Sequence, residues 1–287
     1  MRARWPGIRF HVERLCRAAV LALALPAFAA GDAVTFPGPG IVLVGRIYAP
    51  GGDGPFPAIV LMHGCSGLWR ADGKEPTAVH QFWAEHWRDR GYVALLVDSF
   101  GPRGQKEICT QRHRTIRPER DRPQDAYAAL LWLAGRKEVD AAHVHLMGWS
   151  NGAMSVLNTA RADAPGRPEK GPEFRSAVAF YPGCADLAKS DYRPRFPLLI
   201  QAGGADDWTP ARHCETLAAA SKQGARIDID VYPGAHHAFD GTGKVRTRPE
   251  VRNPSNPTGW GATVGGNPEA RARSIERTTA WIDAHNR

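Results

Sequence analysis

Short apolar runs alternate with longer amphipathic segments along most of the chain. The runs are rich in Val, Ile, Leu and Ala, have the length of strands and end at glycine, proline or polar residues. The predicted strands lie at 41–48, 58–62, 92–97, 143–147, 176–180, 198–202 and 227–232. The predicted helices lie at 80–90, 124–134, 151–161, 210–223 and 268–285. This alternation predicts an α/β fold in which a mostly parallel central sheet carries helices on both faces.

One internal segment does not follow this pattern. Residues 241–267 are rich in glycine and proline and show no clear period. We therefore expect a long irregular loop before the last helix, either a flap over a functional site or a simple surface excursion.

The first thirty residues have the pattern of a secretory signal peptide. Five arginines precede an apolar stretch at 18–28 that ends in small residues, with cleavage expected after Ala29 or Ala30. The stretch is about eleven residues long, and a helix that spans a bilayer needs roughly 20. We expect residues 1–30 to be removed, leaving 31–287 as a single domain in the periplasm or outside the cell, without membrane attachment.

Composition and charge agree with one large domain. The chain has 287 residues, 43% hydrophobic and 23% charged. Loss of residues 1–30 lowers the formal net charge from +8 to +4. A local basic run lacks any aromatic platform or nucleic-acid motif, so we interpret it as a solvated loop. Its members are Arg112, Arg114, Arg117, Arg120 and Arg122. With neither GxGxxG nor GxxxxGK after a strand, no nucleotide cofactor is predicted.

Four cysteines remain after residue 30, and an exported protein is expected to pair them. Three pairings are possible. Two local bridges are favoured, because the partners lie in loops or helices that follow successive strands: Cys65 with Cys109, and Cys184 with Cys214. Free buried thiols are the alternative. The wide spacing and the lack of a CxxC pair argue against a zinc site, and no metal is predicted.

The pentapeptide Gly148-Trp149-Ser150-Asn151-Gly152 lies between an apolar run and a predicted helix. This context is typical of a nucleophile elbow, a tight strand-to-helix turn that exposes a serine hydroxyl above a sheet. The sequence therefore predicts Ser150 as a nucleophile.

An acid and a base follow in the order that such a serine requires. Asp206 and Asp207 come after the strand at 198–202, and His236 and His237 come after the strand at 227–232. Because the reactive loops of a parallel sheet lie at the carboxyl ends of its strands, these residues are expected to converge on the serine. The order Ser, Asp, His is that of the α/β-hydrolases.

Several motifs together resemble the dienelactone hydrolase family of the α/β-hydrolase fold. They are Leu61 to Gly67, Asp98 to Gly104, Gly148 to Gly152, Ala205 to Pro210 and Tyr232 to Phe239. The founding members of the family use a cysteine nucleophile at the elbow. Because this chain has Ser150 there, the resemblance implies a broader carboxylic-ester hydrolase.

The resemblance and the chemistry of acyl transfer assign roles to three residues. Serine needs a base to remove its proton, and His237 is favoured over His236, since adjacent side chains on extended backbone face opposite ways. Asp206 is favoured over Asp207 as the carboxylate that orients the base. Ser150, His237 and Asp206 are the predicted triad.

The tetrahedral intermediate also needs backbone donors for its oxyanion. The N–H of Asn151, directly after the nucleophile, is one expected donor. The second is expected from the loop after the strand at 58–62, where Cys65 is favoured and Gly64 or Ser66 are alternatives.

Substrate contacts are less specified by the sequence. Arg103 either binds a substrate carboxylate, as arginines do in the founding members, or fixes a loop by bonding backbone carbonyls, and the second role is slightly favoured. Trp149 and Trp208 are candidates for an apolar acyl wall, with core packing as the alternative. The remaining histidines are interpreted as surface or capping residues, among them His80, His86, His113 and His213.

The sequence thus predicts an exported serine hydrolase that cleaves small carboxylic esters or lactones through an acyl-enzyme, without a cofactor. Its predicted partner is a small-molecule substrate. Two alternatives remain: a hydrolase of amides or peptides with the same triad, and a noncatalytic binding protein on the same fold.

Overall fold

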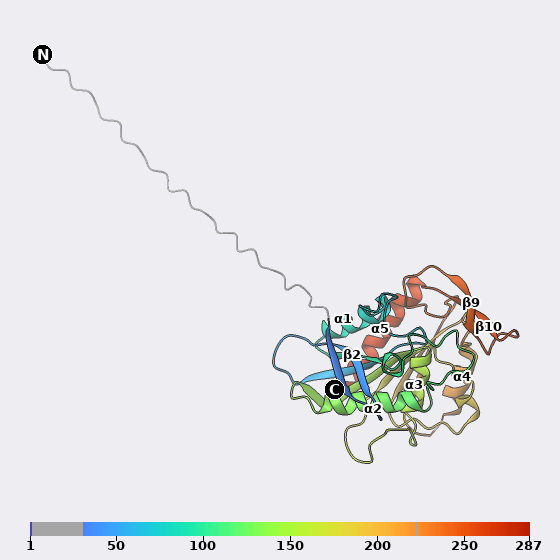
Figure 1. The fold of residues 1–287 in the computed structure, drawn as a ribbon, viewed down its shortest axis with the longest axis horizontal. Coiled ribbons are helices and arrows are strands. Elements are labelled where there is room, and N and C mark those ends of the chain that lie inside the picture. Colours follow the sequence, from blue (N-terminus) through green and yellow to red (C-terminus); the bar gives the residue numbers. More distant parts are fainter. Residues whose placement is uncertain (2–30, 222) are drawn as a thin grey trace. The chain divides into compact units, whose positions relative to one another are not determined.

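An eight-stranded sheet forms the centre of the fold (Figure 1). The computed structural model describes Met1 and residues 31–221 and 223–287, so the predicted signal peptide lies outside the described residues except for Met1. The strands are β1 (Asp32–Pro37), β2 (Val42–Tyr48), β3 (Phe56–Met62), β4 (Val93–Asp98), β5 (Val139–Trp149), β6 (Ala177–Phe180), β7 (Leu198–Gly203), β8 (Ile227–Tyr232), β9 (Arg246–Arg252) and β10 (Trp260–Val264). The helices are α1 (Ala78–Arg88), α2 (Asp121–Ala134), α3 (Asn151–Thr159), α4 (Ala211–Ala220) and α5 (Pro268–His285). Two 3₁₀ turns lie at Gly101–Arg103 and Leu187–Lys189.

The sheet has the strand order β1-β2-β4-β3-β5-β6-β7-β8. β1 and β2 are antiparallel to their neighbours, and the pairs from β4 to β8 are parallel. β5, β7 and β8 therefore end at the same edge, which brings together the loops that follow them. The predicted α/β architecture is confirmed.

Most strands of the sheet are nearly continuous runs of apolar residues, because helices cover both faces of the sheet. In β3, Val60 and Met62 face one cluster of buried residues and Ile59 and Leu61 face the other. Helices α2, α3 and α4 contribute to the first cluster, and α1 and α5 to the second (Figure 1). The alternation of strand side chains thus yields two apolar layers from one run.

All seven predicted strands and all five predicted helices are present; β8 and α5 have the predicted ends, and the ends of the others are shifted. The largest shift is at β5, which begins at Val139 rather than at residue 143. The edge strand β1 was not predicted, because it is only six residues long and most of its side chains are exposed.

The expectation of an irregular loop at 241–267 is wrong. This segment contains the antiparallel hairpin β9–β10. The end of β10 lies beside the residues that follow β8. His237 forms an isolated parallel bridge with Val264, and the N–H of Gly265 donates to the carbonyl of His237 at 2.9 Å. The hairpin therefore supports the backbone of the histidine segment.

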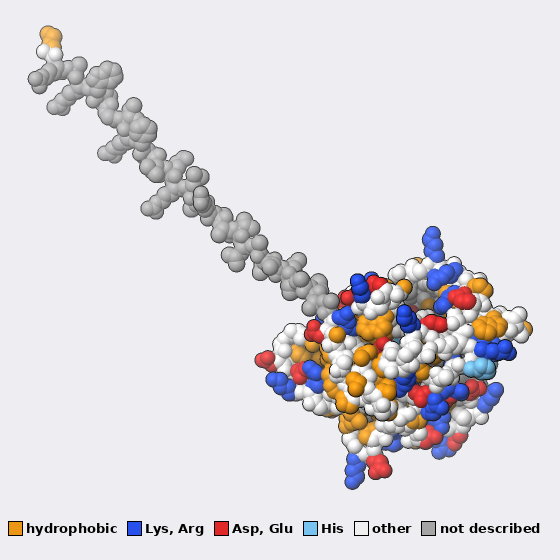
Figure 2. Space-filling model, viewed as in Figure 1, with side chains coloured by type: hydrophobic (Ala, Val, Ile, Leu, Met, Phe, Trp, Pro, Cys, Tyr) orange, Lys and Arg blue, Asp and Glu red, His pale blue; other side chains and the backbone are white. Residues whose placement is uncertain are grey.

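Both predicted disulfide bonds are present, Cys65–Cys109 and Cys184–Cys214. Such bonds are typical of an oxidising compartment. Among the described helices, none is long and apolar enough to cross a membrane. On the face drawn in Figure 2, basic and acidic side chains are interspersed rather than separated by sign.

Candidate active site

Ser150 occupies the sharp turn between β5 and α3. Its backbone has φ 51° and ψ −114°, a strained conformation for a non-glycine residue. The flanking glycines are required by close packing. A Cβ on Gly148 would lie 2.6 Å from the carbonyl oxygen of Gly152, and one on Gly152 would lie 2.0 Å from that of Met62. The GxSxG pattern thus forms a nucleophile elbow, with the serine hydroxyl at the end of β5.

The structure brings Ser150, His237 and Asp206 into one hydrogen-bonded chain. His237 Nε2 lies 2.9 Å from Ser150 Oγ, and His237 Nδ1 lies 2.8 Å from Asp206 Oδ2. Since a carboxylate only accepts, Nδ1 carries the ring proton and Nε2 accepts from the serine hydroxyl. His237 and Asp206 are buried, with 3% and 5% of their surface exposed. The arrangement can remove a proton from Ser150 and stabilise the resulting imidazolium.

Asp206 is held by several donors. The N–H groups of Trp208 and Thr209 both donate to its Oδ1 at 2.8 Å, and Thr209 Oγ1 lies 2.9 Å from its Oδ2. Burial raises the pKa of Asp206, but the attraction of His237 and the hydrogen bonds from His237 and Thr209 outweigh it, so its pKa lies below the ordinary value. The carboxylate is therefore ionised at neutral pH.

The neighbouring candidates have other partners. Asp207 accepts from the backbone N–H and the hydroxyl of Thr263 in β10, both at 2.8 Å. His236 Nδ1 donates to the carbonyl of Ala205 at 2.9 Å. Each of these residues thus bonds away from Ser150.

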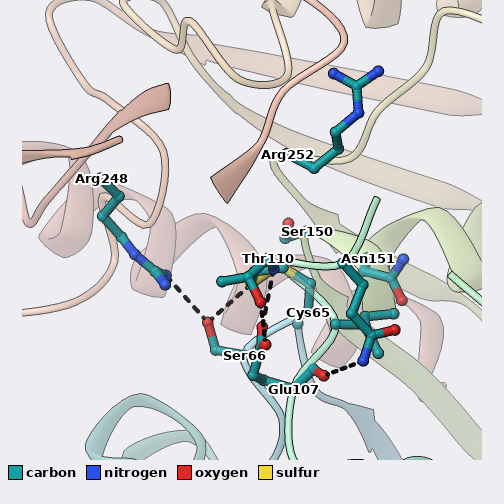
Figure 3. The surroundings of a disulfide bond; sticks show 12 residues. Cys65, Ser66, Glu107, Thr110, Ser150, Asn151, Arg248 and Arg252 are labelled. Atoms are coloured by element: carbon teal, nitrogen blue, oxygen red, sulfur yellow. Dashed lines mark hydrogen bonds between the residues drawn. A yellow bond between two sulfur atoms is a disulfide. The ribbon is translucent and has the colours of Figure 1, made fainter. Parts of the chain in front are cut away.

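The two segments proposed to bind an oxyanion lie beside the serine. Cys65, Ser150 and Asn151 line one cavity, and Figure 3 shows them together next to the Cys65–Cys109 bond, with Arg248 and Arg252 on either side. A Cβ on Gly64 would lie 3.6 Å from the Cβ of Ser150. The loop after β3 therefore reaches the nucleophile, as an oxyanion loop must.

One cavity extends from Ser150 past the start of α3. It has a volume of about 210 Å³, and its walls include Asn151 and Met154 together with Arg114 and Arg252. A wider groove of about 640 Å³ shares these two arginines. This side of the serine thus combines apolar walls with positive charge.

A second cavity of about 220 Å³ lies on the side of the base. Its walls include His237 and the apolar side chains of Val79, Trp149, Tyr181 and Val264. Arg246 and Arg248 also line this cavity, so positive charge borders both cavities. The two cavities share Ser150 but are otherwise lined by largely different residues, so the two parts of a bound ester would meet different surroundings.

The structure gives Arg103 the loop-fixing role. Its guanidinium forms two hydrogen bonds of 2.8 Å to Asp125 and one of 2.7 Å to the carbonyl of Ser99. Arg103 lines neither cavity beside Ser150. The candidate role in substrate binding is therefore replaced by an internal ion pair.

Trp149 and Trp208 both border the site. Trp208 is 8% exposed, lines both cavities and packs its ring 4.7 Å from that of His237. Trp149 lines only the cavity on the side of the base, and its indole N–H donates to Asp240 at 2.8 Å. Trp208 is thus placed to touch substrate on both sides, and Trp149 on one.

The sequence analysis missed Asp240, a fully buried carboxyl behind the site. It accepts from Trp149, from Trp83 at 3.1 Å and from Tyr181 at 2.7 Å. Burial raises the pKa of Asp240 above the ordinary value, and its three hydrogen bonds offset only part of this effect. Its position three residues after His237 was the available signal, and it ties the histidine segment to the residue before Ser150.

Two interpretations of charged residues were wrong. Arg122 was placed in a solvated loop, but it is 0% exposed and lies in the first turn of α2. His80 was interpreted as a surface or capping residue, yet it is 4% exposed and bonds to Thr77. Burial lowers the pKa of His80 to about 4, so the ring is neutral at neutral pH. In both cases tertiary packing covers a residue that local sequence assigns to the surface.

A mostly parallel sheet with helices on both faces and a serine at the elbow after β5 defines an α/β-hydrolase. The chain belongs to the dienelactone hydrolase family, whose model matches residues 43–286. The resemblance seen in the sequence motifs is thereby confirmed.

Solved structures and curated relatives agree with this fold. A putative dienelactone hydrolase from Klebsiella pneumoniae has a TM-score of 0.62 at 19% identity, covering 88% of this chain and 98% of its own. The apo form of esterase 2 from Thermogutta terrifontis has a TM-score of 0.55 at 21% identity, covering 75% and 87%. An uncharacterised protein of Mycobacterium tuberculosis is 28% identical over 208 residues, which is 66% of this chain. The match spans 65% of that relative's length.

Proposed function

We propose that the protein hydrolyses small carboxylic esters or lactones through an acyl-enzyme on Ser150, with His237 as base and Asp206 as its orienting carboxylate. The observation that carries this proposal is the continuous hydrogen-bonded chain from Asp206 through His237 to Ser150, with distances of 2.8 and 2.9 Å. His237 would take the serine proton during attack and then deliver it to the leaving alkoxide.

The developing oxyanion would be bound by the backbone N–H groups of Asn151 and Cys65. A single donor of this kind is typically worth roughly 3 to 4 kcal/mol in the transition state. Water would then attack the acyl-enzyme, with His237 again acting as base, and free Ser150 would be regenerated.

The unequal cavities suggest how an ester would be oriented. Because His237 protonates the leaving group, the alcohol would occupy the apolar cavity that His237 lines, near Val79 and Val264. The acyl group would then extend toward Met154, with Arg114 and Arg252 at its far end. A small acyl group fits the cavity volume of about 210 Å³.

Two structures of one neighbour support the choice of substrate class. Esterase 2 of Thermogutta terrifontis has been solved with propionate bound, and also phosphonylated by sarin. By analogy, we expect this chain to accept short acyl groups and to react with organophosphorus esters.

We also propose that the protein acts outside the cytoplasm. The support is the signal-peptide pattern of residues 1–30 together with the two disulfide bonds.

The function is tested with paired p-nitrophenyl butyrate and p-nitrobutyranilide, whose acyl groups are identical. The wild type should cleave the ester far faster than the anilide, and Ser150→Ala should lose at least about 10⁴-fold of the ester rate, because it removes the nucleophile. A faster anilide rate would favour the amide hydrolase. An ester rate unchanged in the folded Ser150→Ala variant would refute the proposal.

A further inference from the structure

Arg122 is a charged side chain in an unusual place. It is fully buried in the first turn of α2, where the helix dipole disfavours a positive charge. Burial lowers the pKa of Arg122 to about 10 against the attraction of Asp125, so the guanidinium is charged at neutral pH. A buried charge is costly unless its surroundings compensate for it. The contribution of Arg122 to stability alone therefore does not explain a charge at this position.

The guanidinium of Arg122 has neutral partners rather than a carboxylate. One terminal nitrogen donates to the side-chain oxygen of Asn151 at 2.7 Å, and the other to the backbone carbonyl of His63 at 2.7 Å. Asp125, the acid that attracts Arg122 most strongly, is instead bonded by Arg103. Arg122 thus joins the first residue of α3 to the loop after β3.

The His63 end of this bridge continues to Cys65. His63 Nε2 accepts from the N–H of Ser99 at 3.2 Å, so its Nδ1 carries the proton and donates to the carbonyl of Gly64 at 2.8 Å. That carbonyl also accepts from Gly67 N at 3.2 Å. Because a trans peptide directs its N–H opposite to its carbonyl, these bonds fix the direction of the Cys65 N–H.

We propose that Arg122 is a positioning residue for the oxyanion hole, since its guanidinium joins the two segments whose backbone N–H groups, at Cys65 and Asn151, would bind the oxyanion. This inference rests on the proposed function. Preorganised donors need no rearrangement during the reaction. The Arg122 bridge holds the Asn151 segment and the loop after β3 at a fixed distance from each other. The positive charge also lies beside groups that would face a developing negative charge.

The test uses Arg122→Met and Arg122→Lys with p-nitrophenyl butyrate and with 1,1,1-trifluoropentan-2-one. The ketone carries the same acyl chain, adds Ser150 Oγ to its carbonyl and places a negative charge in the hole. In Arg122→Met, kcat/KM and the affinity for the ketone should fall together by about 100-fold, while KM stays within about twofold, as for loss of one oxyanion donor. Arg122→Lys should recover part of both losses, because it keeps the charge but not the two-pronged geometry.

Tyr127→Phe is the matched control in the same helix. The buried Tyr127 hydroxyl donates to the carbonyl of Thr159 at 3.0 Å, at the far end of α3. Its loss should lower the melting temperature without changing kcat or ketone affinity. If Arg122→Met behaves like this control, Arg122 is only a structural residue and the proposal is overturned.

Asn151→Ala provides a second route if Arg122→Met does not fold. It keeps Arg122 and the Asn151 backbone N–H but removes one arm of the bridge, so kcat/KM and ketone affinity should each fall by about 10-fold. Unchanged values would overturn the positioning role. A wild type that neither cleaves the ester nor reacts with a fluorophosphonate would instead remove the proposed function itself.

Discussion

The loops at the ends of β5, β7 and β8 and the β9–β10 hairpin beside them are built in opposite ways. The loops follow buried strands and hold Ser150, Asp206 and His237 in a chain of hydrogen bonds in which Asp206 and His237 are buried and Ser150 is partly exposed. In β9, by contrast, most side chains are exposed, and Val251 is the fully buried one. The sheet therefore places the groups that we propose to react, while the hairpin supports the backbone of the histidine segment and borders the cavities.

The adjacent residues Asp206 and Asp207 belong to different regions: Asp206 bonds to His237, and Asp207 bonds to Thr263 in the hairpin. Substitutions at these two positions should therefore differ most in their effect on kcat. Asp206→Asn should lower kcat by as much as about 10⁴-fold, because an amide cannot stabilise the imidazolium and favours the wrong tautomer. Asp207→Asn removes only a contact with Thr263 and should change kcat by less than about threefold. The measurement is kcat of both variants for the same ester, from steady-state kinetics. Equal losses in the two variants would contradict the assignment of the acid.

The buried sheet should also respond to acid through His145. Burial lowers the pKa of His145 to about 4, below the ordinary 6.5 that applies to the unfolded chain. As the pH falls from 6.5 toward 4, the unfolded state binds a proton that the folded state refuses, so stability present above pH 6.5 is lost. For one buried group the loss is on the order of 3 kcal/mol.

His145→Asn should flatten this part of the profile. In denaturant melts, the free energy of unfolding should fall more steeply with acid for the wild type than for the variant between pH 6.5 and pH 4.5, by about 1.4 kcal/mol per pH unit, and the two slopes should agree from pH 8 to pH 6.5. If the two plots of unfolding free energy against pH were parallel, His145 would have the same pKa in the folded and unfolded states.

The smallest effect on kcat/KM is expected at Arg252, where the hairpin borders the cavity that we propose to hold the acyl group. Arg252→Met should lower kcat/KM for the p-nitrophenyl monoester of glutarate by about fivefold, as for a partly exposed ion pair worth about 1 kcal/mol. The uncharged pentanoate ester should be cleaved at nearly the same rate by both proteins. An equal fall in kcat/KM for the two esters would show that Arg252 does not recognise the charge. Arg103→Ala is the control, and any change that it makes in kcat/KM should be the same for both esters.

The sequence was most informative where local chemistry determines structure. The glycines at 148 and 152 specify the elbow, since a Cβ at either would collide with backbone. Strand runs buried on both faces are recognisable as apolar segments, and the residues that follow them reach one edge of the sheet. The positions of Ser150, Asp206 and His237 could therefore be anticipated, and the structure brings these three side chains together.

What could not be anticipated depends on partners distant in sequence. β9 contains mostly charged residues and a proline, and it is a strand because β10 pairs with it. Arg122 resembles its exposed neighbours in the basic run until α2 packs it against His63 and Asn151. Asp240 is one acid among many until Trp83, Trp149 and Tyr181 converge on it.

The central claim is that Ser150 is a nucleophile activated by His237. The most direct measurement is to treat the protein with a fluorophosphonate probe and locate the adduct by peptide mass, with Ser150→Ala and His237→Ala treated in parallel. The account predicts one adduct on Ser150, none in Ser150→Ala and much slower labelling in His237→Ala. An adduct on another residue, or an unlabelled wild type that is folded and cleaves esters, would contradict it.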